Sequence, residues 1–349
     1  MPSPARTIPR LDDGSAPAPL RQGRSRRRRF DEAWDPFDDY VVDFALAALR
    51  AGERICLVTL VAIEGASPRP LGAQMAIAES GRWVGYLSGG CVEQAVIAEA
   101  IEAIRDGQNR RVRYGRGSRY LDIRLPCGSA IDLHFDVEVS AAELEAVERR
   151  MKDRQYASLN VGEALPDAAE PALIRHYPPR RRLIILGIGP APVCLGRMAE
   201  TAGFDVLLFS PDTATRQAGE GEGLATFAMS RADRMPEIRM DRDAAVVLMF
   251  HDHEWETTLL PPILRSESFY IGAMGSRRAH EARLAALREA GVGEESLRRI
   301  HGPAGLFAGA RSAPAIAVAI LAEIMEIMMS EGEMLLLEAD ELRRAIACD

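Results

Sequence analysis

The segment Ser88-Gly89-Gly90-Cys91-Val92-Glu93 places a thiol between two glycines and the start of an amphipathic stretch. Apolar residues recur at helical spacing from Val92 to Arg105, and Gly107 can end that helix. The first N–H groups of a helix lack partners and carry partial positive charge, so they favour an anion or a thiolate at Cys91. The pattern indicates a chemical role for Cys91; the alternative is a small apolar side chain buried in a tight turn.

Two other positions are candidates for chemistry in the second half of the chain. His251-Asp252-His253 follows a buried run, but two histidines and one acid are a thin signature for a metal site. Arg277 and Arg278 open a predicted helix after Gly275-Ser276, which is typical of anion contact and equally of a solvated first turn.

The remaining reactive residue types exclude several classes of protein. Lys152 is the only lysine, which excludes a Walker-type phosphate loop and makes Schiff-base chemistry improbable. The chain contains neither a G-x-S-x-G elbow nor an H-E-x-x-H helix. Five cysteines are widely spaced without a CxxC pair, which argues against a disulfide framework or a structural zinc site and favours a reducing cytoplasm.

Charge is distributed unevenly along the 349 residues, whose formal net charge is −8. Residues 1–30 carry eight arginines against two aspartates, so the rest of the chain holds about −14 and is a poor candidate for nucleic-acid binding. We expect this basic tail to be disordered, because it has few apolar residues. It is not an export signal, since acidic residues follow the arginines where an apolar segment would be needed, and no run predicts a membrane span.

Element patterns predict an α/β protein with two domains. Residues 31–140 combine two helical patterns with strand-like runs and a hairpin, which indicates a mixed α+β domain. Residues 141–180 are expected to form a helix and a proline-rich linker, and residues 331–349 a C-terminal helix.

Residues 181–330 alternate buried strands and helices, as in a Rossmann-like, doubly wound parallel sheet. The glycine turn after the first strand reads Gly187-Ile188-Gly189-Pro190. A dinucleotide fingerprint needs a small residue where Pro192 stands and an acid where Ser210 stands, so the fold is well supported and NAD binding poorly supported.

Several motifs together resemble the XdhC/CoxI family over residues 37–325. In the first domain they are residues 67–75, the segment around Cys91, and Pro126-Cys127-Gly128; in the second they are residues 251–253, 270–278 and 305–311. In many relatives a histidine follows the glycine turn of the second domain, whereas this chain has Pro190.

The resemblance implies a maturation chaperone for molybdenum hydroxylases of the xanthine dehydrogenase, CO dehydrogenase or aldehyde oxidoreductase type. Such a protein binds the molybdenum cofactor, as molybdopterin or its dinucleotide, and assists its sulfuration by a cysteine desulfurase before insertion into the apo-enzyme. It implies an accessory factor rather than an enzyme, and a possible homodimer, with no membrane partner.

Within that resemblance, backbone N–H groups and arginine would bind a phosphate, and cysteine thiolates suit molybdenum or sulfur. The resemblance leaves open whether Cys91 or Cys127 contacts the cofactor, and Cys127 can equally be a core turn residue. The expected cofactor-binding residues are Arg69, Ser88, Gly89, Gly90, Cys91, Glu93, Cys127, Gly187, Gly189 and Arg277.

A nicotinamide-dependent oxidoreductase is the alternative function, because the Rossmann pattern is shared with dehydrogenases. Pro190 and Pro192 weigh against it.

Overall fold

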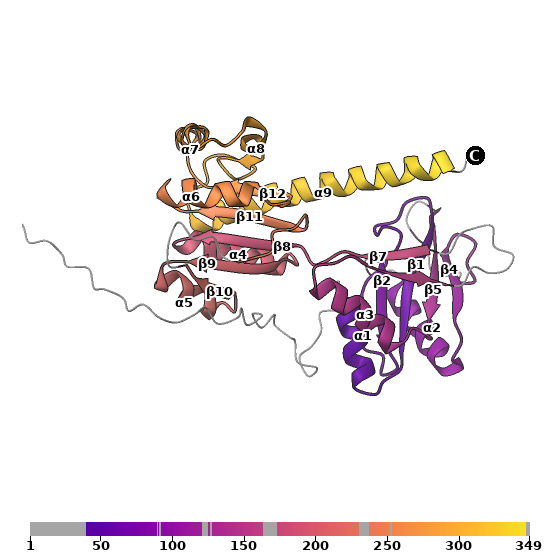
Figure 1. Cartoon of the computed structure of the whole chain (residues 1–349). Helices are drawn as coiled ribbons and strands as arrows, with labels where there is room; N and C mark the ends of the chain where they lie inside the picture. The colour runs from indigo at the N-terminus through magenta and orange to yellow at the C-terminus, as the bar shows by residue number, and fades with distance from the viewer. Residues whose placement is uncertain are drawn as a thin grey trace, which may run out of the picture.

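The computed structural model describes residues 40–88, 90, 92–120, 125, 128–162, 173–229, 237–251 and 253–346. The side chains of residues 253, 254 and 331–346 are not described. Figure 1 shows two lobes, joined near the start of β8. The predicted basic tail, residues 1–30, lies outside the described residues.

The first lobe is built on an antiparallel five-stranded sheet in the order β3-β2-β1-β5-β4. Runs rich in β-branched and aromatic residues predict these strands, and tight glycine turns separate them. The strands are β1 (Ile55–Glu64), β2 (Gln74–Ala78), β3 (Trp83–Gly85), β4 (Arg110–Gly115) and β5 (Ala130–Asp136). The helices beside them are α1 (Val41–Arg50), α2 (Glu93–Asp106) and α3 (Ala141–Lys152).

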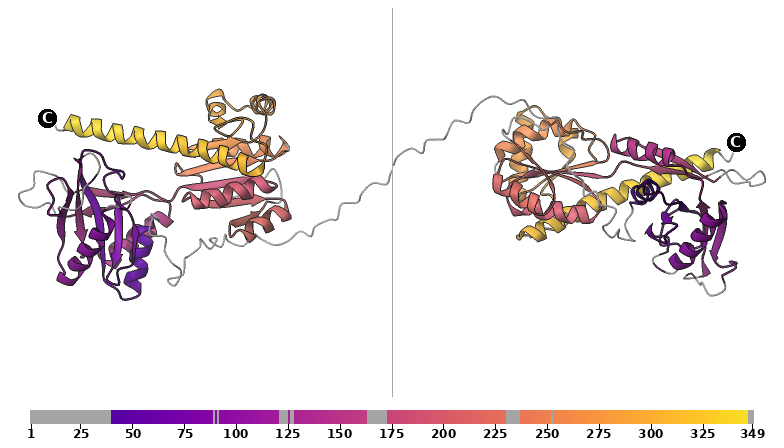
Figure 2. Two further views of the ribbon diagram at one scale, coloured as in Figure 1. Left: turned by 180° about the vertical axis from the view of Figure 1, so that it is seen from behind. Right: turned by 90° about the horizontal axis from the view of Figure 1, so that it is seen from below.

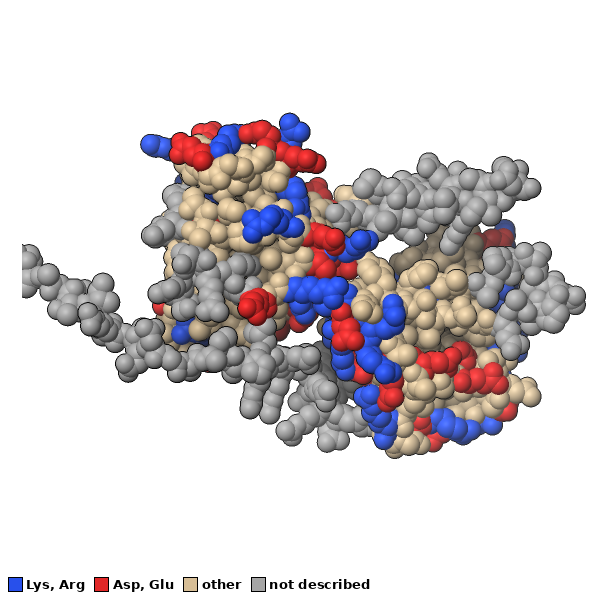
Figure 3. Space-filling model, viewed as in Figure 1, with Lys and Arg blue, Asp and Glu red and all other residues tan. Residues whose placement is uncertain are grey.

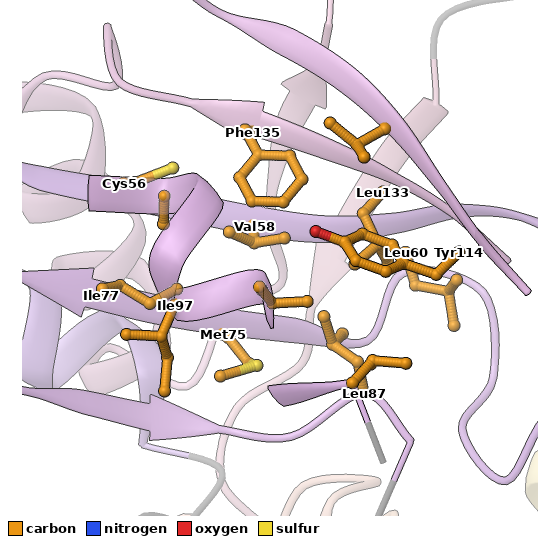
Figure 4. Close-up of a cluster of buried hydrophobic side chains, with 14 of the residues drawn as sticks. Cys56, Val58, Leu60, Met75, Ile77, Leu87, Ile97, Tyr114, Leu133 and Phe135 are labelled. Atoms are coloured by element: carbon orange, nitrogen blue, oxygen red, sulfur yellow. The ribbon is translucent and has the colours of Figure 1, made fainter. Parts of the chain in front are cut away.

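Both faces of this sheet are buried, because β1 alternates its side chains between two helical layers. Cys56, Val58 and Leu60 pack against α2, as Figure 4 shows for the labelled members of that cluster. Ile55 and Leu57 face α1 and α3 on the other side. The sheet is therefore the central layer of a three-layer domain.

The segment predicted as a proline-rich linker contains two paired strands. These are β6 (Ala157–Val161) and β7 (Leu173–Tyr177), which form an antiparallel pair. Tyr177 is buried with α1 and donates a hydrogen bond to Gln74 Oε1 at 2.8 Å, and Gln74 donates to Thr59 at 2.9 Å. The linker prediction was wrong here because a short amphipathic strand carries little signal beside prolines, and its burial depends on the distant β2.

The second lobe is a parallel six-stranded sheet in the order β10-β9-β8-β11-β12-β13. In chain order this is 3-2-1-4-5-6, the doubly wound arrangement of Rossmann domains. β11 is buried along its whole length, as expected for a strand covered on both faces. The strands are β8 (Arg182–Gly187), β9 (Asp205–Ser210), β10 (Ala225–Ala228), β11 (Ala244–Met249), β12 (Tyr270–Ala273) and β13 (Ile300–His301).

Helices cover both faces of the parallel sheet, as the right-hand view of Figure 2 shows. The cluster on one face includes α4 and α9, and the cluster on the other includes residues of α6, α7 and α8. The helices are α4 (Pro190–Thr201), α5 (Thr213–Gly221), α6 (His253–Leu264), α7 (Arg277–Glu289), α8 (Glu294–Arg298) and α9 (Ala313–Ile346).

Charged side chains link the two lobes. Arg154, after α3, forms a two-pronged ion pair with Asp241 of the second lobe, at 2.9 and 2.6 Å. Tyr156 donates to Asp243 at 3.3 Å, and Arg181 pairs with the same carboxylate at 3.2 Å. Figure 3 shows positive and negative side chains mixed where the lobes meet.

Within the described residues, α9 is the one helix that meets the length and composition of a membrane span. Residues 313–330 have a mean hydropathy of 1.7, and 22% of them are buried. Ala317, Ile320 and Ile324 pack into the core of the parallel sheet. Core helices of this kind pass the same test, so the helix is weak evidence for a membrane.

A buried ion pair tests the packing of the second lobe. Arg283 and Glu256 lie at 2.8 and 2.9 Å, with side chains 0% and 2% exposed. Glu256→Ala leaves a buried charge without its carboxylate, so we expect it to destabilise the protein by about 3–5 kcal/mol in urea unfolding. The control is Glu294→Ala, which removes the exposed partner of Arg288 and should cost under about 1 kcal/mol. Equal losses in the two variants would contradict the assignment.

Candidate functional site

Three connections of the first lobe meet at one end of its sheet. Residue pairing brings the end of β1 beside the start of β5 and the end of β4 beside that same start. The start of β2 lies beside the end of β3, after which the chain enters α2. The connections 65–73, 86–92 and 116–129 therefore share one edge of the domain. They contain all three first-domain motifs found in the sequence.

Glu93 holds the segment that contains Cys91. Its side chain is buried and accepts hydrogen bonds from the backbone N–H groups of Ser88 and Gly90 at 2.8 Å. The N–H groups of Leu87 and Val92 donate to the same carboxylate at 3.1 Å, and so does the Ser88 hydroxyl at 2.8 Å.

This arrangement changes the role expected of the glycine segment. Gly90 has a φ of +118°, a backbone conformation that favours glycine and turns its N–H toward Glu93. The N–H groups expected to bind an anionic ligand thus include several that already bind a carboxylate of the chain. Burial opposes ionisation of Glu93, but the hydrogen bonds from Ser88 and Leu87 outweigh it and lower the pKa of this carboxyl.

Arg69 lies beside this segment. Its guanidinium stacks over the Tyr86 ring at 4.2 Å and donates to the Tyr86 hydroxyl at 3.1 Å. The same connection is attached to a third one, because Ala66 N–H donates to the Ser129 hydroxyl at 3.2 Å. Arg69, Ser88 and Glu93, three of the predicted residues, are therefore brought together by the fold.

The remaining first-domain residues of the prediction cannot be placed. Gly89, Cys91 and Cys127 lie outside the described residues, so their assignment to a cofactor site stays a prediction. Their neighbours are placed: Gly90 on one side of Cys91, and Ser129 two positions after Cys127.

Sequence reasoning missed Glu99, a second buried carboxylate on α2. Its side chain is 1% exposed and accepts hydrogen bonds from Arg110 at 2.9 Å, from Arg119 and from the Tyr120 hydroxyl. Burial raises the pKa of Glu99, and these donors together lower it below its ordinary value. The available signal was an acid on the apolar face of a predicted helix, which needs a partner.

In the second lobe, Gly187 and Gly189 serve the packing of the glycine turn. A Cβ at Gly187 would lie 2.6 Å from the Met249 carbonyl oxygen, so the residue allows β8 to approach β11. Gly189 N–H donates to the Thr215 hydroxyl at 2.8 Å, and Ile188 N–H to Met249 at 3.3 Å. These two N–H groups are engaged within the chain.

Arg277 lies in a different lobe from Arg69 and Ser88. It is exposed in the first turn of α7, which Ser276 caps through a 3.1 Å bond from Ala279 N–H. Figure 1 shows α7 at the end of the second lobe distant from the first. His251 is exposed, Asp252 lies outside the described residues, and the described part of the chain gathers no cluster of metal-binding side chains.

Known sequences resolve the family. A model described as the XdhC Rossmann domain matches residues 183–324, and one described as the XdhC and CoxI family matches residues 48–115. The molybdenum cofactor insertion chaperone PaoD of Escherichia coli is 35% identical over 309 residues, covering 85% of this chain and 91% of PaoD. The chain belongs to the XdhC and CoxI family. The family predicted from the motifs is thereby confirmed.

Two other comparisons extend along most of the chain. A protein of Bacillus subtilis described as a probable xanthine dehydrogenase component is 27% identical over 329 residues, covering 80% of this chain and 95% of that protein. The crystal structure of a Bacillus halodurans protein described as a xanthine dehydrogenase superposes with a TM-score of 0.69, at 21% identity over 83% of this chain and 96% of that one. At this identity the likeness shows the fold alone, and the predicted fold class is confirmed.

The Glu93 carboxylate predicts a specific acid sensitivity. Because its pKa is lowered on folding from the ordinary 4.5, its contribution to stability is complete above that value and is lost as pH falls through the folded value. Glu93→Gln replaces one accepting oxygen by a donor, and we expect a loss of about 2–4 kcal/mol at neutral pH. The difference between variant and parent should shrink toward about pH 4 in thermal unfolding.

Glu102→Gln is the matched control for that experiment. Glu102 lies on the same helix with an exposed side chain, so its replacement should leave stability and its pH profile unchanged. A Glu93→Gln protein as stable as the parent at neutral pH would show that the carboxylate does not hold the segment.

Proposed function

We propose that this protein is a chaperone that binds the molybdenum cofactor and delivers it to a molybdenum hydroxylase apo-enzyme. The observation that carries the proposal is the convergence of the three first-domain motifs at one end of the sheet, in a chain that shares 35% identity with PaoD over 85% of its length. The cofactor is cargo, held and passed on.

The residues at this end of the sheet fit the chemistry of the cargo. The partly exposed Arg69 guanidinium has planar N–H donors that suit the phosphate of a pterin or the diphosphate of its dinucleotide form. Ser88 contributes a hydroxyl beside it. Cys91 and Cys127 follow the motifs to the same connections and would supply soft sulfur ligands for molybdenum or handle sulfur.

The finer details of the proposal concern partners and place. We include a cysteine desulfurase as the source of the sulfur that the mature cofactor requires, and a homodimer as the assembly. The cytoplasm is the proposed compartment, because five widely spaced cysteines suit a reducing environment. The role is that of an accessory factor rather than a catalyst.

NAD(P) binding by the second lobe is the competing function, and the geometry at the start of α4 disfavours it. Pro190 and Pro192 stand at the first and third helical positions and have no N–H to offer a pyrophosphate. Gly189 N–H is bonded to Thr215, and Asp212, the acid after β9, caps α5 through Thr215.

Titration with NAD(H) and NADP(H) tests this competitor directly. We expect no saturable binding up to about 1 mM, the upper end of ordinary substrate affinities. Micromolar affinity together with turnover of any small substrate would replace the chaperone proposal by an oxidoreductase.

Replacing Cys91 tests the chaperone proposal. We expect Cys91→Ala, co-expressed with the cofactor pathway, to retain about a tenth or less of the molybdenum and pterin found per chain in the parent. Metal analysis and pterin fluorescence after oxidation measure the two parts of the cargo separately. Absence of cofactor from the parent protein would overturn the proposal.

Cys56→Ala is the matched control for a cysteine without a cargo role. Cys56 is fully buried on β1, and burial raises the pKa of its thiol well above the ordinary range, so it is an apolar core residue. Its replacement should lower stability and leave the cofactor content per folded chain unchanged.

A further inference from the structure

Two large apolar side chains are exposed on the first lobe. Leu71, in the connection between β1 and β2, is 49% exposed. Ile174, on β7, is 50% exposed. They are separated by about a hundred positions in the sequence, yet the segments that carry them touch.

The contact between the two segments is direct. A Cβ built on Gly72 would lie 3.2 Å from Cδ of Arg175, which places the residues after Leu71 and Ile174 against each other. We call the surface formed by Leu71 and Ile174 the apolar rim.

Both sides of the apolar rim are held firmly. Gly72 N–H donates to Leu60 O at 2.8 Å, and Leu60 N–H donates to Ala73 O at 2.9 Å, so the Leu71 connection is attached to β1. β7 is attached through the buried hydrogen bond from Tyr177 to Gln74, the first residue of β2. Exposed apolar side chains on a rigid support lose little conformational freedom when a protein covers them.

The apolar rim lies next to the candidate cargo site. Leu71 is two residues after Arg69, which stacks on Tyr86 just before the Glu93-bound segment. A protein that covers Leu71 and Ile174 therefore lies beside the end of the sheet where the three motifs meet.

We propose that the apolar rim docks the recipient apo-enzyme, so that the opening of its empty cofactor cavity faces the cargo site. This inference rests on the proposed function, and it assigns the surface through which the handover occurs. The partner is a folded protein with an apolar patch beside a cavity that accepts a phosphorylated pterin. A second copy of this chain on the rim would stand where the recipient must approach, so we assign the homodimer contact elsewhere.

The test compares the parent, Leu71→Glu/Ile174→Glu and Leu306→Glu, each loaded with the cofactor. Leu306 is the matched control, 50% exposed in the second lobe and away from the rim. The probe is the cofactor-free molybdenum hydroxylase from the same genome, purified from a strain that cannot make the cofactor. Cofactor per chain, affinity for the probe and activity recovered by the probe are measured together with sedimentation velocity.

We expect the double variant to keep its cofactor content and sedimentation, and to lose affinity for the probe and recovered activity by about tenfold or more. Leu306→Glu should match the parent in every measurement. A folding defect in the double variant would be visible by circular dichroism, and Leu71→Ala/Ile174→Ala then supplies a milder version with a smaller loss in the same two measurements.

Three results would overturn the inference. They are parent-like affinity in both rim variants, an equal loss in Leu306→Glu, or a change of the oligomeric state in the rim variants, which would make the rim a contact between copies. A parent protein without cofactor defeats the proposed function instead, and the separate measurement of cargo distinguishes that failure.

Discussion

The candidate site depends on one buried carboxylate. Glu93 accepts four backbone N–H groups from a short segment that has no regular secondary structure. Unpaired N–H groups near a helix start would cost free energy in a buried position, and a free carboxylate there would cost more. Each satisfies the other, so the segment has one well-defined path into α2. The residues that flank Cys91 are fixed by this contact.

A second carboxylate on the same helix extends the principle. Glu99 lies on α2 two turns after Glu93 and binds Arg110 of β4 and the Arg119–Tyr120 segment. Stacking of Tyr120 on Tyr114, with ring centres 5.1 Å apart, adds contact area to that attachment. One helix thereby holds the connection that contains Cys91 and the connection that leads to Cys127. α2 organises the site through its polar residues and the core through its apolar ones.

The second lobe keeps the Rossmann architecture while using its usual ligand-binding groups for other purposes. The turn after β8 is occupied by internal hydrogen bonds, and prolines replace two of the N–H donors of α4. Its ion pairs with the first lobe, centred on Arg154 and Asp241, attach it to the domain that carries the motifs. The fold alone therefore says little about function, which follows from the groups placed at each site.

Much of this architecture was open to prediction because periodicity and residue type are local properties. The βα alternation after residue 181 predicts the parallel sheet, and the spacing after Val92 predicts α2. The two strands β6 and β7 escaped prediction, since their burial depends on Tyr177 reaching Gln74 across about a hundred residues. The motifs identified the family, but their order along the chain does not reveal which of them lie together.

The sequence by itself determined the class of fold, the family, and the residue types available for chemistry. Only the tertiary structure decided what each group does. It turned Glu93 from a candidate ligand contact into the acceptor that positions its neighbours, and it revealed Glu99 as a second acceptor of that kind. It also placed Arg277 in a different lobe from Arg69. The physical reason is that hydrogen-bond partners and desolvation arise from contacts between distant segments, which no local pattern encodes.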